Sequence, residues 1–310
     1  MATALPAMLS CFGKLLRARE LFGQVTESAS EFRKHDHYEI VRFDNARSAT
    51  DELVRVQWRI NILNPVPEDW AYLTGDAVNN MRSALDHALA VVARQRLGFS
   101  DTDVQKHRLQ FPICDTSDSF AAVAKNLVKI LPQDLVDQLE KLQPYHGDPD
   151  DSVHNLAMVR DLSNLDKHRR LTVVAHGVYR SRVTIEPPMD VVSLKENTGA
   201  LADGMVLATV KFRRPVNPPE LTLTPEIRYV ESLFIPGSNT FVPLAVALEL
   251  MFEEAFIAVE SLTRDLMGAK DIMFAKVYLD DREARTRGLL ATLATAAEIE
   301  SLSQTEGAAS

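Results

Sequence analysis

The chain has 310 residues, of which 46% are hydrophobic and 25% charged, which is the composition of an ordinary globular protein with a sizeable core. Its formal net charge of -9 disfavours electrostatic binding of nucleic acid or an anionic membrane by the whole surface, but does not exclude a local basic cleft. Cys11 and Cys114 lie far apart without metal-ligand neighbours, so they predict reduced thiols and a cytoplasmic protein.

No segment of the sequence is typical of a membrane protein. The N-terminus has no basic residue before its apolar part, so it is a poor secretion signal. The most apolar stretch, 242–262, carries four glutamates. Because carboxylates are costly in a bilayer, this stretch predicts a buried helix of a soluble protein and no membrane partner.

The first half of the chain alternates between helical and strand periodicity. Apolar residues recur at helical spacing over 8–33 and alternate over 38–43 and 53–60. The clearest helix spans 67–97 and ends at Gly98, a residue that commonly caps helices. Shorter helices are predicted over 117–130, 132–142 and 153–169.

The second half of the chain changes to strands. Four runs rich in β-branched residues predict strands at 171–174, 182–186, 205–212 and 227–234. A long helix follows over 242–267 and stops at Gly268, and a further helix is predicted near 283–297. The last dozen residues, rich in Ser, Thr, Glu and Ala, predict a disordered tail.

The order of these elements predicts an α+β fold, in which a helical bundle packs with an antiparallel sheet of about five to six strands and a long C-terminal helix. We expect a single body over 1–268, with 269–310 as a peripheral helix and a disordered tail. Within that body, the predicted parts are a helical core, a strand-rich part and a closing helix, at 67–170, 171–236 and 242–268.

The predicted helix 67–97 has an unusual polar face. One side carries an apolar stripe that includes Met81, Leu85 and Val92. The opposite side has no Lys or Glu and consists of short polar groups, Arg and His: Asp76, Asn79, Asn80, Arg82, Ser83, Asp86 and His87. Because short polar side chains weaken a helix, their concentration indicates hydrogen-bonding roles beyond solubility.

Two interpretations of this polar face stay open. In the first, Arg82 and Asp86 lie one helical turn apart, pair, and anchor a neighbouring loop as a structural network. In the second, the face is a functional site, in which Arg82 and His87 lie roughly 140° apart around the helix and flank a groove.

A second group of polar residues ends the predicted helix 153–169. Asp166 and Arg169 project on the same side as the apolar Leu162 and therefore point into the protein. A buried charge needs a partner, and Asp166 can pair with Arg169 or with Arg82. Cations favoured at a helix C-terminus are the alternative explanation for Arg169 and its neighbours. The candidate binding residues here are Asn164, Asp166, Lys167, His168 and Arg169.

Other candidate metal ligands are set aside. His35 and His37 near a turn are expected to be solvent-exposed. Glu249, Glu253 and Glu260 lack a Glu-x-x-His partner, so they fit a solvated stripe. The sequence therefore predicts no metal and no cofactor.

Four blocks of the sequence resemble a family of uncharacterised bacterial proteins. They are Asn-Met-Arg-Ser-Ala-Leu-Asp-His at 80–87, Phe-Pro-Ile at 111–113, Leu-Gln-Pro-Tyr at 142–145 and Leu-Ser-Asn-Leu-Asp-Lys-His-Arg at 162–169. The chain also resembles HEPN ribonucleases, helical domains with an arginine followed a few residues later by a histidine, as in Arg82 and His87. That resemblance implies a metal-independent endoribonuclease, usually dimeric, in which Arg82 binds the scissile phosphate and His87 handles the ribose 2′-OH proton.

Three functions therefore stay open. The first is metal-independent RNA cleavage by Arg82 and His87, with RNA and a second copy of the chain as partners. The second is a binding module for a small ligand or a protein, in which Arg82, Asp86, Asp166 and Arg169 form a structural network. The third is a stress or defence accessory protein whose polar clusters are purely structural. The acidic net charge favours the second and third.

Overall fold

The computed structural model describes residues 8–45, 51–147, 154–177, 182–186, 190–197, 199–214, 222–226 and 229–281. The chain divides into two compact units, and each combines segments that are distant in sequence. The first unit is Met1–Arg19, Asn79–Arg160 and Glu249–Ser310, and the second is Glu20–Val78 and Asp161–Leu248. These units do not coincide with the predicted parts 67–170 and 171–236, because several long helices contribute residues to both.

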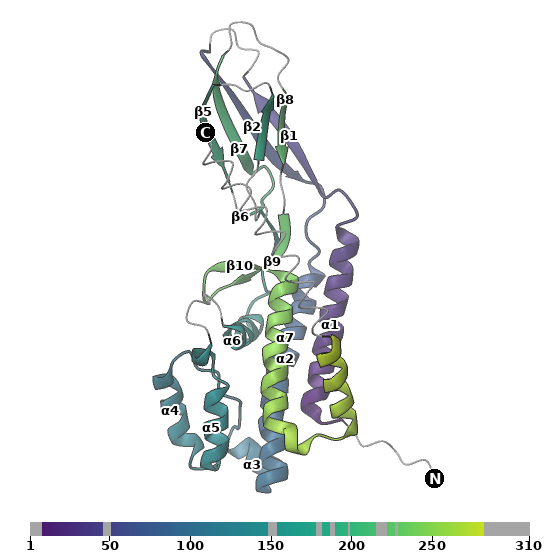
Figure 1. The fold of residues 1–310 in the computed structure, drawn as a ribbon, viewed down its shortest axis with the longest axis vertical. Coiled ribbons are helices and arrows are strands. Elements are labelled where there is room, and N and C mark those ends of the chain that lie inside the picture. The colour runs from purple at the N-terminus through teal and green to yellow at the C-terminus, as the bar shows by residue number, and fades with distance from the viewer. Residues whose placement is uncertain are drawn as a thin grey trace, which may run out of the picture. The chain divides into compact units, whose positions relative to one another are not determined.

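The main predicted helices are present, with bounds within a few residues of the expected ones (Figure 1). Two short helices begin with a capping box, in which a Ser or Thr side chain and the residue three positions later bond each other's backbone: Ser100 with Asp103, and Thr116 with Ser119. The helices are α1 (Ser10–Phe32), α2 (Asp69–Leu97), α3 (Asp101–Lys106), α4 (Ser117–Leu127), α5 (Gln133–Lys141), η1 (Pro144–His146), α6 (Asn155–Asp166), α7 (Leu244–Thr263) and η2 (Arg264–Leu266).

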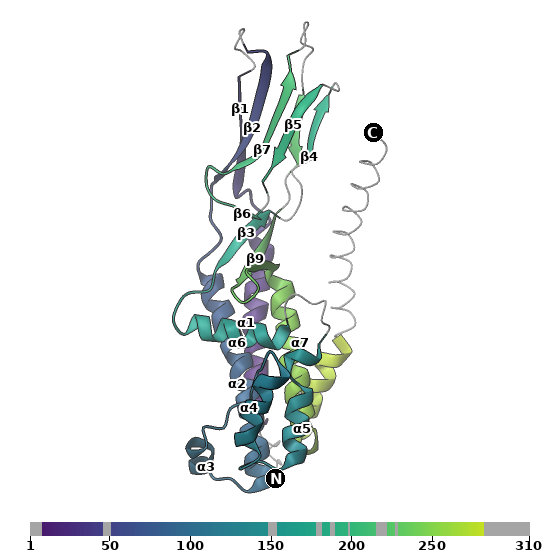
Figure 2. The ribbon, with the colours of Figure 1, turned by 90° about the vertical axis from the view of Figure 1, so that its left-hand side faces the viewer.

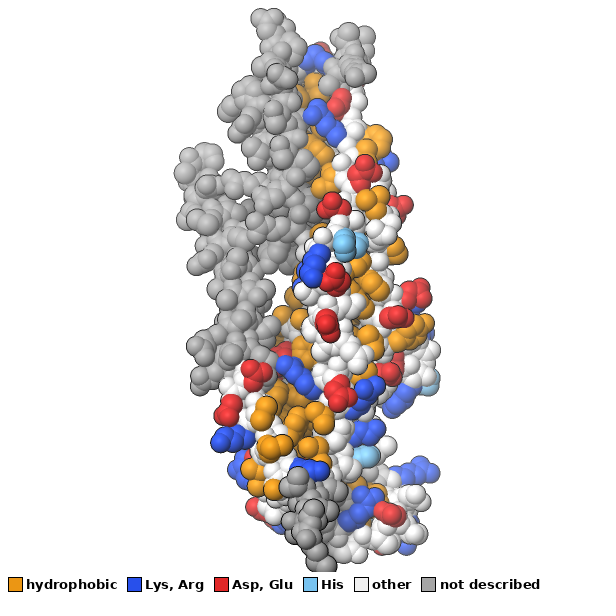
Figure 3. Space-filling model, turned by 90° about the vertical axis from the view of Figure 1, so that its right-hand side faces the viewer, with side chains coloured by type: hydrophobic (Ala, Val, Ile, Leu, Met, Phe, Trp, Pro, Cys, Tyr) orange, Lys and Arg blue, Asp and Glu red, His pale blue; other side chains and the backbone are white. Residues whose placement is uncertain are grey.

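A further helical segment covers 269–281, directly after Gly268, where the long predicted helix was expected to stop. The buried carboxylate of Asp271 accepts hydrogen bonds from the backbone N–H groups of Gly268 and Leu9, both at 3.0 Å, so it ties this segment to the start of α1. The same segment exposes Ile272, Met273 and Val277 to solvent. Figure 3 shows hydrophobic side chains gathered into a patch on one face of the molecule. The predicted helix at 283–297 and the predicted tail lie outside the described residues.

The strands confirm the predicted α+β class. Those in the described part of the chain belong to more than one sheet. Two antiparallel sheets have four strands each, in the orders β1-β2-β7-β5 and β10-β9-β3-β6, and β4 pairs with β8 (Figure 1). The strands are β1 (Tyr38–Asp44), β2 (Leu53–Ile62), β3 (Val173–Gly177), β4 (Arg182–Glu186), β5 (Val191–Glu196), β6 (Gly199–Ala200), β7 (Val206–Arg213), β8 (Thr222–Glu226), β9 (Tyr229–Ile235) and β10 (Thr240–Pro243).

The β1-β2-β7-β5 sheet buries one face. Alternate residues of β2 and β7 form a compact apolar cluster of Val54, Val56, Trp58, Ala208, Val210 and Phe212. The register places Val56 opposite Val210 and Trp58 opposite Ala208. Because side chains alternate between the two faces of a strand, the residues between them project from the opposite face, which is polar.

Within the second unit, α6 ends against α2 at a glycine. Figure 2 shows α6 lying across the direction of α2. A Cβ atom added at Gly75 would lie 2.3 Å from Oδ1 and 2.7 Å from Cγ of Asp166. The half-buried Asp166 carboxylate therefore occupies the space that any other residue at position 75 would need.

Substitution of Gly75 with alanine is expected to lower the free energy of unfolding by about 1–2 kcal/mol, because the clash outweighs the better helix propensity of alanine. The matched control is Gly23→Ala in α1, where a Cβ would meet nothing within 4 Å. That variant is expected to be more stable than wild type by about 0.5–1 kcal/mol. Urea unfolding measures both, and equal stabilisation by the two alanines would contradict this packing.

Candidate functional site

Two residues on the polar face of α2 hydrogen-bond the backbone of Phe111, a loop residue in the first unit. Nη2 of Arg82 donates a hydrogen bond to Oδ1 of Asp86 at 2.9 Å and another to the Phe111 carbonyl at 2.8 Å. The same Asp86 oxygen accepts a hydrogen bond from the Phe111 backbone N–H at 2.9 Å. Arg82 and Asp86 therefore pair, as their spacing predicts, and together satisfy both backbone polar groups of Phe111, as a neighbouring strand would.

The side-chain amide of Gln143 hydrogen-bonds the backbone of the next loop residues, Pro112 and Cys114. Gln143 follows α5 and is 3% exposed. Its Oε1 accepts a hydrogen bond from the Cys114 N–H at 2.9 Å, and its Nε2 donates to the carbonyls of Pro112 and Leu139 at 3.0 and 2.8 Å. A buried amide with these partners uses nearly its whole hydrogen-bonding capacity on the backbone.

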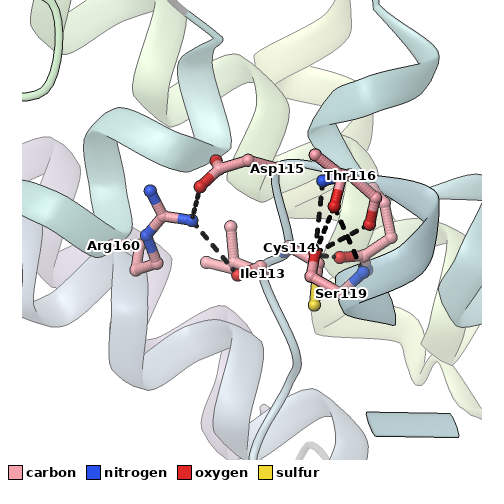
Figure 4. A network of polar contacts seen from close by, with 7 residues as sticks. Ile113, Cys114, Asp115, Thr116, Ser119 and Arg160 are labelled. Atoms are coloured by element: carbon pink, nitrogen blue, oxygen red, sulfur yellow. Dashed lines mark hydrogen bonds and ion pairs between the residues drawn. The ribbon is translucent and has the colours of Figure 1, made fainter. Parts of the chain in front are cut away.

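Arg160 of α6 holds the end of the same loop (Figure 4). Its Nη1 donates to the Ile113 carbonyl at 3.3 Å and forms an ion pair with Asp115 at 2.8 Å. Directly after Asp115, the capping box of Thr116 and Ser119 begins α4 (Figure 4). Burial is the largest cause that raises the pKa of the neighbouring Cys114 thiol, so this thiol is protonated at neutral pH.

These contacts form one network, which we call the 111–114 clamp. Five backbone atoms of the loop bond to side chains from three other parts of the chain: Arg82 and Asp86, Gln143, and Arg160. Three of the four sequence blocks, 80–87, 111–113 and 142–145, meet here. The arrangement explains structurally why these residue types occur in those blocks, and it matches the interpretation in which Arg82 and Asp86 anchor a neighbouring loop.

No protein family, curated protein or solved structure matches this chain. The resemblances to the bacterial family and to HEPN ribonucleases therefore stay predictions. In the part of the chain that the structure describes, no helix is long and apolar enough to cross a membrane. Those residues also contain no group of three His, Cys, Asp or Glu side chains placed to bind a metal ion.

Four other residues of the α2 polar face are half-buried, Asn79, Asn80, Ser83 and His87, and Asp76 is exposed. Oδ1 of Asn80 accepts a hydrogen bond from the Lys14 ammonium at 3.3 Å. The pKa of His87 is lowered, first by burial and then by the nearby positive charge of Lys14. The imidazole is therefore neutral at neutral pH, in the form that can accept a proton.

The second predicted cluster lies at the end of α6 in the second unit. Asn164, His168 and Arg169 line an open pocket together with Asp161, Leu165, Pro236 and Gly237. Lys167 is exposed and lies outside the pocket lining, and Asp166 faces Gly75 of α2. Side chains of the 164–169 cluster thus face in different directions, and three of the five share the pocket.

His35 and His37 were both expected to be solvent-exposed, and this prediction is wrong for His37. Its side chain is 7% exposed and stacks on Phe32, with ring centroids 3.4 Å apart. Its Nε2 bonds the Phe32 carbonyl, so its polar edge meets the end of α1. His37 lies five residues beyond the end of α1, so the helical pattern of α1 does not reveal its burial.

The prediction of a solvated glutamate stripe is wrong at Glu249. This carboxylate is 7% exposed and pairs with Arg19 of α1 at 2.7 Å. The pair satisfies a charge that burial would otherwise make costly. Because an ion pair between distant helices leaves no trace in local spacing, only the packed structure shows it.

Sequence analysis missed two members of the 111–114 clamp, Gln143 and Arg160. Gln143 stands inside the block 142–145, and this block is the signal that points to it. Arg160 follows the apolar pair Met158 and Val159 on a helix, a position that is ordinary for a surface cation. Its role appears only when α6 is placed against the loop.

Proposed function

We propose that this protein is a binding module for a small molecule, with its ligand in the pocket at the end of α6. The observation that carries the proposal is the convergence of Asn164, His168 and Arg169 with Asp161 on one open pocket. The side chains of His168 and Arg169 make no hydrogen bond or ion pair with other described residues, so their donors are available. The 111–114 clamp supports the proposal indirectly, because it gives Arg82 and Asp86 a structural role.

The lining of the pocket indicates the chemistry of the ligand. The guanidinium of Arg169 and the amide of Asn164 suit a carboxylate. The carboxylate of Asp161 disfavours a second negative charge and accepts a hydrogen bond from the ligand. Leu165 and Pro236 supply apolar contact. We therefore expect a small monocarboxylate that also carries an amino or hydroxyl group.

A titration with a panel of amino acids and hydroxy acids, followed by calorimetry and thermal shift, tests this proposal. Acetate is the matched probe that lacks the hydrogen-bond donor. Arg169→Ala is expected to weaken binding about tenfold or more, because it removes a charge-assisted hydrogen bond. Lys167→Ala removes a cation from the same helix end but not from the pocket, and should bind as wild type. Equal affinities for the two variants would contradict the proposed site.

Metal-independent RNA cleavage by Arg82 and His87 is a second candidate function. One observation favours it: the lowered pKa of His87 keeps the imidazole neutral and able to accept the 2′-OH proton. In this case wild type cleaves RNA without added metal, and His87→Ala abolishes cleavage without changing the melting temperature. Absence of cleavage by wild type would remove this candidate. The homodimer, the bacterial source and the cytoplasmic location stay predictions.

A further inference from the structure

The polar face of the β1-β2-β7-β5 sheet concentrates positive charge. Arg55 and Arg59 alternate with the buried residues of β2, so they project from this face. The register places Lys211 of β7 opposite Arg55, and Lys195 of β5 opposite Thr209. All four cations are exposed, and none of them forms an ion pair with a carboxylate of the described residues.

This concentration of charge costs stability. Arg55 and Lys211 face each other directly across an antiparallel pair, where like charges are destabilising. The chain as a whole carries a net charge of -9, so the cations do not follow from its composition. Within the four strands this face carries one described carboxylate, Glu39 of β1, which accepts a hydrogen bond from Asn61, so the cations outnumber the carboxylates on it. A role in binding an anion explains the arrangement, and solubility does not.

An aromatic ring, that of Phe43, lies among these cations on the same face of the sheet. Phe43 of β1 lies opposite Gln57 and is 49% exposed. The guanidinium carbon of Arg59 lies 5.0 Å from the centroid of this ring. Gln57 in turn bonds Thr209 at 3.2 Å, so one cross-strand row runs Phe43, Gln57, Thr209 and Lys195. Aromatic rings, arginine planes and amides on a flat surface are groups that stack on and hydrogen-bond to unpaired bases.

We propose that this face binds single-stranded nucleic acid, with phosphates on Arg55, Lys211 and Lys195 and a base stacked on Phe43. Neighbouring strands lie about 5 Å apart and residues 55 and 59 about 13 Å apart along β2, so the cations span several phosphates. A flat sheet face presents groups to splayed bases, whereas duplex grooves are read by inserted helices or ribbons. The stacking ring favours nucleic acid over an anionic membrane. The proposal is independent of the pocket at the end of α6.

Fluorescence anisotropy with the full chain and a labelled oligouridine of about 12 nucleotides tests the proposal. We expect binding at about 50 mM salt that weakens about tenfold at about 200 mM, from two to three phosphate contacts. An oligothymidine of the same length distinguishes RNA from DNA, and both results support the proposal. A double-stranded oligonucleotide of the same length and phosphatidylserine vesicles are the comparison probes. Binding only to the double-stranded oligonucleotide, only to the vesicles, or to none of these probes would overturn the proposal.

Three variants separate a binding role from a structural one. Arg55→Glu places opposite charges across from each other at Lys211, so it should raise the melting temperature while weakening RNA binding at least tenfold. Phe43→Ala should weaken binding about tenfold and reduce the salt dependence little, because stacking is not ionic. The control Lys106→Glu changes the net charge as Arg55→Glu does, at an exposed position of α3. Equal affinity for wild type and Arg55→Glu would overturn the proposal.

Discussion

Substitution of Gln143 with leucine is expected to lower the free energy of unfolding by about 3–5 kcal/mol, because each buried polar group left without a partner costs about 1–3 kcal/mol. Leucine nearly preserves the volume of the side chain, so the loss reports hydrogen bonds and not a cavity. Three backbone groups lose their partner: the N–H of Cys114 and the carbonyls of Pro112 and Leu139. Chemical unfolding measures the change.

Hydrogen exchange gives a second, local measurement of the same variant. The Cys114 N–H should lose protection, because the Gln143 oxygen is its hydrogen-bond acceptor. The matched control is Gln133→Leu at the exposed start of α5, where we expect a change within about 0.5 kcal/mol. A stability of Gln143→Leu within about 1 kcal/mol of wild type would show that the 111–114 clamp does not hold the loop as described.

The long elements of this fold could be predicted because each has a periodic pattern that continues over many residues. α1 and α2 alternate apolar and polar residues at helical spacing over more than twenty residues each. β2 alternates almost strictly between buried and exposed positions. The short strands β6 and β10, with 2 and 4 residues, are too brief to carry a pattern, and only their partners in the sheet define them.

The 111–114 clamp was predictable in part. The spacing of Arg82 and Asp86 on one helix predicts their pairing, since residues four apart are neighbours. The partner of that pair is a backbone, and the backbone of residue 111 has no signature in the sequence. Gln143 was equally hidden, because a buried amide and a surface amide have the same residue name. What decides between them is which groups the packed chain leaves without water.

The positive charge on the polar face of the β1-β2-β7-β5 sheet could not be predicted from the sequence, for a different reason. Each strand taken alone shows one or two cations among polar residues, which is ordinary for an exposed face. Arg55 and Lys211 are 156 residues apart in the sequence, and only the register of β2 and β7 brings them opposite each other. A register cannot be read from one sequence, because it depends on turn geometry and on both strands together.

Removal of Arg82 is expected to destabilise the protein even when no substrate is present. We expect Arg82→Ala and Asp86→Ala each to lower the free energy of unfolding by about 2–3 kcal/mol, since each removes the ion pair of a half-buried charge together with one hydrogen bond to the Phe111 backbone. The double variant should lose about 1–2 kcal/mol less than the sum, because both residues act on the same atoms. Burial decides the magnitude: the two side chains are 17% and 26% exposed.

The ion pair of Arg94 and Asp101 is the matched control for this cycle. It also joins an α2 arginine to an aspartate, here the first residue of α3, at 2.8 Å, but its side chains are 40% and 81% exposed. We expect Arg94→Ala to cost less than about 1 kcal/mol, as is usual for surface pairs. If Arg82→Ala were as mild as Arg94→Ala, the Arg82 guanidinium would be free for another role. The proposal of RNA cleavage would then gain its strongest support, because its phosphate-binding group would not be needed to hold the fold.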